Sequence, residues 1–156
     1  MLRDVSDWAH IGYGGKSTLV KEELKSPEGL KYIIKYPRKF KKGVSWEDVT
    51  ELIAAKIGSI LGLEMMKVEI VTRNNERGCL LRNFVDEYHA KMHEEGGVLL
   101  DSLAIGYNEL QKSNSKGKKL IHEGFAMLTQ FDYWRQIKDT FIDMLIFDIL
   151  IGNQDR

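Results

Sequence analysis

The chain has 156 residues, of which 43% are hydrophobic, enough for one compact domain or two small lobes with a core. Its 23 basic and 23 acidic side chains give a formal net charge of zero, which argues against nucleic acid or a membrane surface as a bulk partner. A single cysteine, Cys79, excludes an internal disulfide framework and a multi-cysteine metal site and favours the cytoplasm. The longest apolar run, Met144–Phe147, is too short to cross a bilayer, and the N-terminus lacks a signal-peptide core.

A glycine-rich turn is predicted near the N-terminus. Trp8–Ile11 and Thr18–Leu24 are predicted as strands, so the glycines between them lie at the tip of a hairpin. Backbone N–H groups of such a tip can approach phosphate oxygens closely, although a plain flexible hairpin is the alternative. The sequence is not a P-loop, because His10 stands where that motif needs glycine and no helix is predicted after the tip. The tip residues are Gly12, Tyr13, Gly14, Gly15, Lys16 and Ser17.

The third predicted strand, Leu30–Tyr36, carries a lysine among apolar residues and ends at Pro37. Because side chains alternate along a strand, Lys35 shares one face with Ile33. It is either an edge lysine that reaches into water or a cation held on the sheet to meet phosphate. The basic segment that follows, Arg38–Gly43, is predicted to be a solvated loop.

A helix is predicted next, with Ser45 as its N-cap and an end near Gly62. Glu47 and Asp48 fall in its first turn, where the helix dipole favours acidic side chains. Its apolar residues recur at helical spacing and predict an amphipathic helix; they are Trp46, Val49, Ile53, Ile57 and Ile60.

Glu51 lies on the opposite side of this predicted helix, beside Ala55 and Gly58. Such small neighbours permit another element to approach closely, whereas a solvated face more often carries long charged side chains. An ordinary surface carboxylate is the alternative interpretation of Glu51.

Two more strands, Met66–Thr72 and Arg77–Val85, are predicted around the turn Arg73–Glu76. From Asp86 onward the pattern is polar and then helical, with helices expected at about 98–111, about 120–138 and in the last segment. The predicted fold is α+β: a five-stranded antiparallel lobe with one helix over 1–86, a crossover over 87–96, and the start of a helical lobe over 97–156.

The last helix, from Asp139, is apolar on every side, which predicts a position in the middle of a core. Gly152 is expected to end it in the left-handed conformation. The polar residues Asn153–Arg156 then emerge from a rigid support, so the carboxylate of Asp155 is held firmly and reaches solvent. A helix cap followed by a surface turn is the alternative.

The order of these features is the plan of a protein-kinase-like fold. Three segments make the resemblance more specific: Tyr32–Pro37, the pair Thr50-Glu51 ahead of Gly62, and Ile151–Arg156. With them the chain resembles the HipA-like serine/threonine kinases, the catalytic domain of bacterial toxin–antitoxin kinases.

This resemblance implies a role for each matching position. Lys35 would bind the ATP phosphates, Glu51 would orient that lysine, and the glycine tip would cover the phosphates. Asp155 would accept the proton of the substrate hydroxyl. The adenine would lie against the backbone where the crossover begins, at Asn83, Phe84 and Val85.

The resemblance also implies ATP and Mg²⁺ as cofactors, a protein substrate, and an antitoxin or DNA-binding partner protein. No metal ligand is expected within this chain, since the family places its metal-binding Asn and Asp after the position of Arg156. We therefore expect these 156 residues alone to be inactive and to expose the apolar last helix. The alternative function is a non-catalytic nucleotide-binding or regulatory module, such as a degenerate or split kinase subunit.

Overall fold

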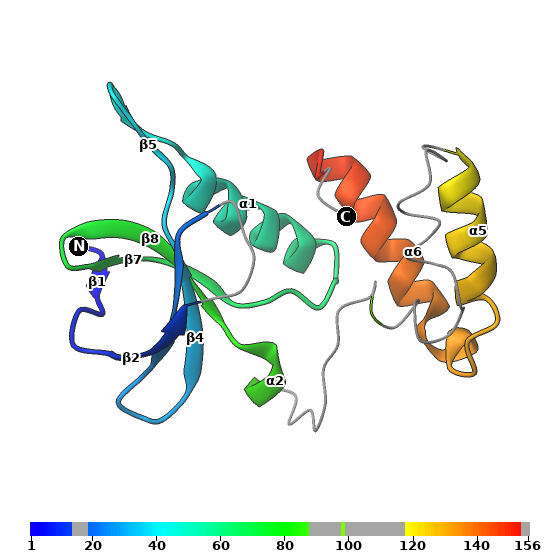
Figure 1. The fold of residues 1–156 in the computed structure, drawn as a ribbon, viewed down its shortest axis with the longest axis horizontal. Helices are drawn as coiled ribbons and strands as arrows, with labels where there is room; N and C mark the ends of the chain where they lie inside the picture. Colours follow the sequence, from blue (N-terminus) through cyan, green and yellow to red (C-terminus); the bar gives the residue numbers. More distant parts are fainter. Residues whose placement is uncertain (14–18, 88–97, 99–117, 154–156) are drawn as a thin grey trace. The chain divides into compact units, whose positions relative to one another are not determined.

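The computed structural model describes residues 1–13, 19–87, 98 and 118–153. The chain divides into two compact units, Met1–Lys91 and Met92–Arg156 (Figure 1). The predicted crossover over 87–96 and the helix predicted at about 98–111 lie almost entirely outside the described residues, so both stay predictions. Among the described helices, none has the length and apolar character needed to cross a membrane.

The first unit is built on a mixed sheet of six strands, in the order β1-β7-β8-β4-β3-β2. All neighbouring strands run antiparallel except β1 and β7, which are parallel. The prediction of five antiparallel strands is therefore wrong by one strand. The strands are β1 (Arg3–Asp4), β2 (Ala9–Tyr13), β3 (Lys21–Lys25), β4 (Lys31–Lys35), β7 (Val68–Arg73) and β8 (Glu76–Arg82).

The additional strand, β1, has only two residues, too few for an alternating pattern to reveal it. It is held at the sheet edge beside β7, and Val5 continues the ladder by donating its N–H to the Thr72 carbonyl at 2.9 Å. The predicted turn between β7 and β8 is confirmed. Asn74 and Asn75 occupy it with φ angles of 51° and 65°, the left-handed conformation that a two-residue hairpin turn requires.

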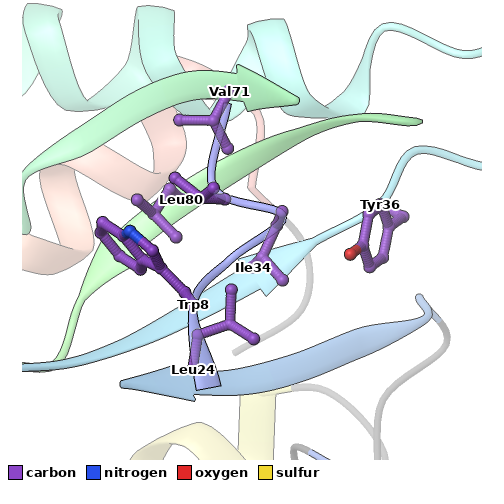
Figure 2. Close-up of a cluster of buried hydrophobic side chains, with 7 residues drawn as sticks. Trp8, Leu24, Ile34, Tyr36, Val71 and Leu80 are labelled. Carbon is purple, nitrogen blue, oxygen red and sulfur yellow. The ribbon is translucent and has the colours of Figure 1, made fainter. Parts of the chain in front are cut away.

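The hydrophobic core of this unit lies on one face of the sheet. Ile34 on β4 and Leu80 on β8 face each other in register and are nearly inaccessible to solvent (Figure 2). The segment Val5–Trp8 closes over them, since Val5 is fully buried and the Trp8 ring packs at a tilt against Tyr32, with ring centroids 4.9 Å apart. The cluster consists of Val5, Trp8, Leu24, Ile34, Tyr36, Val71 and Leu80.

One buried arginine fastens the N-terminal segment to the sheet. Nη1 of Arg73 lies 2.8, 3.3 and 3.0 Å from the backbone oxygens of Val5, Ser6 and Trp8. Its Nε pairs with Glu22 at 3.2 Å, and the same carboxylate accepts a hydrogen bond from the hydroxyl of Tyr36. Burial raises the pKa of Tyr36, and the hydrogen bond to Glu22 raises it further. The network satisfies a buried charge that would otherwise be costly.

Helix α1 (Glu47–Ile60) packs on β7 and β8. Its N-cap is Trp46 and not the predicted Ser45. The hydroxyl of Ser45 donates instead to the carboxylate of Glu47 at 2.6 Å, which also accepts the Arg38 backbone N–H at 2.9 Å. These hydrogen bonds lower the pKa of Glu47, with Ser45 the larger cause. The basic segment before α1 forms the short hairpin β5 (Lys39–Phe40) and β6 (Gly43–Val44), all exposed.

Helix α1 buries the face that carries its small residues. Asp48, Ala55 and Gly58 are buried, and a Cβ atom added at Gly58 would lie 2.5 Å from the sulfur of Met65. The prediction that small residues permit close approach is therefore confirmed. The apolar residues of the helix do not form its buried side, since Trp46, Ile53 and Ile60 are 66%, 53% and 84% exposed.

The second unit contains α5 (Lys118–Leu128) and α6 (Trp134–Ile151). The prediction of one helix over about 120–138 is wrong, because turns at 129–133 separate the two helices. The sequence there has no glycine or proline to mark the break, and the Thr129 hydroxyl donates to the Ala126 carbonyl at 2.7 Å. Phe125 of α5 contacts Trp134 and Phe141 of α6, with centroids 5.6 and 6.0 Å apart.

The composition of helix α6 predicted burial on every side, and this prediction is wrong. Phe147 is 5% exposed, whereas Ile146, Ile149 and Leu150 are 59%, 81% and 63% exposed. The expectation that this chain exposes the apolar surface of its last helix agrees with these values.

Gly78 on β8 provides a test of how tightly the sheet packs. A Cβ atom there would lie 2.8 Å from the backbone oxygen of Lys35 and 3.1 Å from Cγ1 of Ile34. Gly78→Ala should lower the free energy of unfolding by about 1–3 kcal/mol, because the β4 backbone must shift. The measurement is urea denaturation followed by circular dichroism.

The matched control is Gly12→Ala on β2, where the added carbon would lie 3.4 Å from the flexible Glu23 carboxylate. We expect it to change the free energy of unfolding by no more than about 0.5 kcal/mol. Equal losses in the two variants would show that Gly78 is not a site of close packing.

Candidate functional site

Lys35 lies in the interior of the sheet, because β4 is between β3 and β8. The alternation of side chains sends Ile34 into the hydrophobic core and Lys35 to the opposite face, on which α1 packs. Lys35 is therefore not an edge lysine. Its side chain is 27% exposed, so the ammonium group is partly withdrawn from water but still accessible.

Glu51 of α1 pairs with this lysine. Nζ of Lys35 lies 2.5 Å from Oε1 of Glu51, and the Glu51 side chain is 37% exposed. The structure thus brings together two residues 16 positions apart that the sequence had singled out separately. An ammonium group has three donors, so after the bond to Glu51 two remain to meet an anionic ligand.

Only the first part of the glycine tip is among the described residues. Gly12 and Tyr13 end β2, opposite Glu23 and Glu22 of β3, after a bulge between His10 and Gly12. Tyr13 is 79% exposed and contacts the His10 ring, with centroids 4.6 Å apart. Gly14, Gly15, Lys16 and Ser17 lie outside the described residues, so their predicted contact with phosphate stays a prediction.

The segment predicted to hold the adenine differs from expectation in its local structure. The strand predicted to reach Val85 ends at Arg82, and α2 (Phe84–Glu87) follows. The cause is Asn83, whose side-chain oxygen accepts the Val85 backbone N–H at 2.9 Å and so turns the chain out of the sheet. The Asn83 N–H still bonds to the Lys31 carbonyl at 3.0 Å, which fixes the turn at the end of the ladder.

The end of α6 is as the sequence predicts. Gly152 caps the helix with φ 68°, the left-handed conformation. Asn153 then folds back, because its N–H donates to the Asp148 carbonyl at 2.8 Å and its side-chain amide donates to the Asp148 carboxylate at 2.9 Å. Asp148 is 5% exposed, so the start of the polar segment is fixed to a buried group. Asp155 lies outside the described residues, and its role stays a prediction.

Cys79 is a neighbour of Lys35 that the sequence analysis did not place at the site. It stands opposite Lys35 in the β4–β8 ladder and is 1% exposed. Burial raises the pKa of the Cys79 thiol to about 12, and the charge of Glu51 contributes. The alternation of side chains along β8 indicates the face on which Cys79 lies, but it points to Lys35 only once the register between β8 and β4 is known.

No group of three or more His, Cys, Asp and Glu side chains in the described residues could hold a metal ion. The described part of the site therefore offers a cation, Lys35, and its carboxylate partner. Such an arrangement can orient an anion but supplies no metal ligand set of its own.

The fold is similar to the crystal structure of the Helicobacter pylori proinflammatory kinase CtkA, with a TM-score of 0.76 and 22% sequence identity. The match covers 100% of this chain and 52% of that chain, so the chain spans about half the length of that kinase. No protein-family model matches the chain, and no curated protein matches it. The chain thus has a mixed α+β fold similar to that of a kinase.

The buried thiol gives a prediction that checks this face of the sheet. Burial raises the pKa of the Cys79 thiol to about 12, so the thiol is expected to stay protonated at pH 8 in the folded chain. Alkylation of Cys79 by iodoacetamide should therefore be at least about a thousandfold slower than in the urea-unfolded chain, because only the thiolate reacts. The rate is measured by intact mass against time. Fast alkylation of the folded chain would show that Cys79 is not buried beside Lys35.

Proposed function

We propose that the chain is the ATP-binding lobe and the first part of the helical lobe of a serine/threonine protein kinase of the HipA-like kind. The observation that carries the proposal is the ion pair between Lys35 on an interior strand and Glu51 on α1, within a fold similar to that of a kinase. A lysine held in this way is a fixed cation, and phosphate groups are the ligands that such a cation binds in phosphoryl-transfer enzymes.

Each part of the lobe would contribute separately to ATP binding. Lys35 would donate to phosphate oxygens while Glu51 holds its side chain in one direction, so less conformational entropy is lost on binding. The glycine tip, which begins at Gly12 and Tyr13, would lie over the phosphates with its backbone N–H groups. The adenine would lie against the segment from Asn83 to Val85, whose turn the Asn83 side chain fixes.

Catalysis would fall to the polar segment after α6. Asp155 would accept the proton of a serine or threonine hydroxyl, a role that suits a carboxylate because the loose transition state needs mainly a positioned acceptor. Asn153, bonded to the buried Asp148, would give that segment a fixed starting point. Mg²⁺ would neutralise charge on the phosphates when bound. An antitoxin-type partner protein remains a prediction from the family resemblance.

The proposal is tested by comparing Lys35→Met with Asp155→Asn in the complete native protein. Lys35→Met should weaken MgATP binding by about 10- to 100-fold, since it removes a charge-assisted hydrogen bond to phosphate. Asp155→Asn should leave MgATP binding unchanged and slow phosphoryl transfer by about 100-fold or more, since it removes the proton acceptor. Calorimetry measures binding, and transfer of labelled phosphate to a protein acceptor measures activity.

Arg3→Gln serves as the control, because it removes an exposed ion pair with Glu69 away from Lys35 and should change neither property. Wild-type binding by Lys35→Met would contradict the role of the lysine. Binding of ATP without phosphoryl transfer by the native protein would favour the non-catalytic nucleotide-binding module instead.

A further inference from the structure

A second ion pair joins α1 to the sheet, one turn before Glu51. Nε of Arg77 on β8 lies 2.6 Å from Oδ2 of Asp48, and Nη2 lies 3.1 Å from Oδ1, so the guanidinium holds both carboxylate oxygens. Nη2 also donates to the Ser45 carbonyl at 3.0 Å. The Asp48 side chain is fully buried, and the Trp46 ring lies 4.7 Å from the guanidinium carbon.

The two ion pairs are arranged in the same way. Asp48 and Glu51 are three residues apart on α1, which places them on one face of the helix. Arg77 and Cys79 are two residues apart on β8, and Cys79 stands opposite Lys35. Two neighbouring strands thus each present a cation to successive turns of the same helix, Arg77 to Asp48 and Lys35 to Glu51.

Hydrophobic packing does little to fix the rotation of α1 on the sheet. Its buried residues are Asp48, Ala55 and Gly58, while its large apolar residues are mostly exposed. Small side chains allow a helix to slide or turn with little loss of buried apolar area. A bidentate ion pair between a guanidinium and a carboxylate has one favourable geometry. It therefore fixes the position of the helix more than it adds to the stability of the fold.

We propose that Arg77 and Asp48 are positioning residues for the nucleotide site: they set the rotation of α1 so that Glu51 meets Lys35. The proposal rests on the proposed function for its effect on ATP but not for its effect on the Lys35–Glu51 pair. It predicts that Asp48 acts on ATP binding through Glu51 and has no effect on the site when Glu51 is absent.

The experiment compares Asp48→Asn, Glu51→Gln and the double variant in the native protein. The first readout is the rate at which an acylating reagent modifies Lys35, followed by peptide mass spectrometry without nucleotide. Each single variant should raise this rate about two- to fivefold, the range expected when a partly exposed ion pair is lost. The double variant should react no faster than Glu51→Gln, because the two changes act through one pair. MgATP dissociation constants should show the same non-additive pattern.

Two further variants separate positioning from stability. Glu22→Gln removes the pair with Arg73 on the opposite face of the sheet, and it should lower the melting temperature without changing the acylation rate of Lys35. Arg77→Lys keeps the charge but loses the two-point geometry, so its acylation rate should lie between those of wild type and Asp48→Asn.

An Asp48→Asn variant that melts earlier but leaves the acylation rate of Lys35 unchanged would overturn the proposal, and so would full additivity in the double variant. A wild-type protein that does not bind MgATP would overturn the proposed function alone, because the acylation rates still decide whether Asp48 positions Glu51.

Discussion

The alternation of side chains along β4 is the constraint on which both faces of the sheet depend. Ile34 must enter the core under the N-terminal segment, and Lys35, one residue later, must then point to the face that carries α1. A one-residue slip of β4 would exchange the two, placing a charge in the core and an isoleucine opposite Glu51. The pairing of Ile34 with Leu80 excludes that slip, because both side chains are almost fully buried. The core therefore determines where the lysine is found.

Helices α1 and α6 are held to their neighbours by different kinds of contact. Helix α6 meets α5 through aromatic rings, those of Phe125, Trp134 and Phe141. Helix α1 meets its sheet through charged groups and small residues, an arrangement that gives less stability but a defined orientation. A defined orientation is what a cation needs if it is to receive a ligand of fixed geometry.

Much of the secondary structure around the candidate site could be predicted from the sequence, because its signals are local. The strands around Lys35, the Arg73–Glu76 turn and the left-handed Gly152 follow from alternation, turn residues and capping rules. The features that were predicted wrongly or missed depend on tertiary structure. The buried side of α1 could not be found from its apolar residues, because the helix buries Asp48 against an arginine that the sequence alone does not place. The two-residue β1 is defined by its pairing with β7, a strand distant in the sequence, and the end of β8 at Arg82 is set by the side-chain hydrogen bond of Asn83.

The fastening of the N-terminal segment by Arg73 has a consequence for how this lobe could be shortened. Residues 5–8 contribute two core side chains, Val5 and Trp8, and three of the carbonyl groups around a buried guanidinium. A version beginning at Ala9 would keep every residue of the Lys35–Glu51 pair yet leave Arg73 with Glu22 as its remaining charged neighbour and open the core to water. The smallest autonomous form of the lobe therefore extends well ahead of its glycine tip, into a stretch with no side chain at the candidate site.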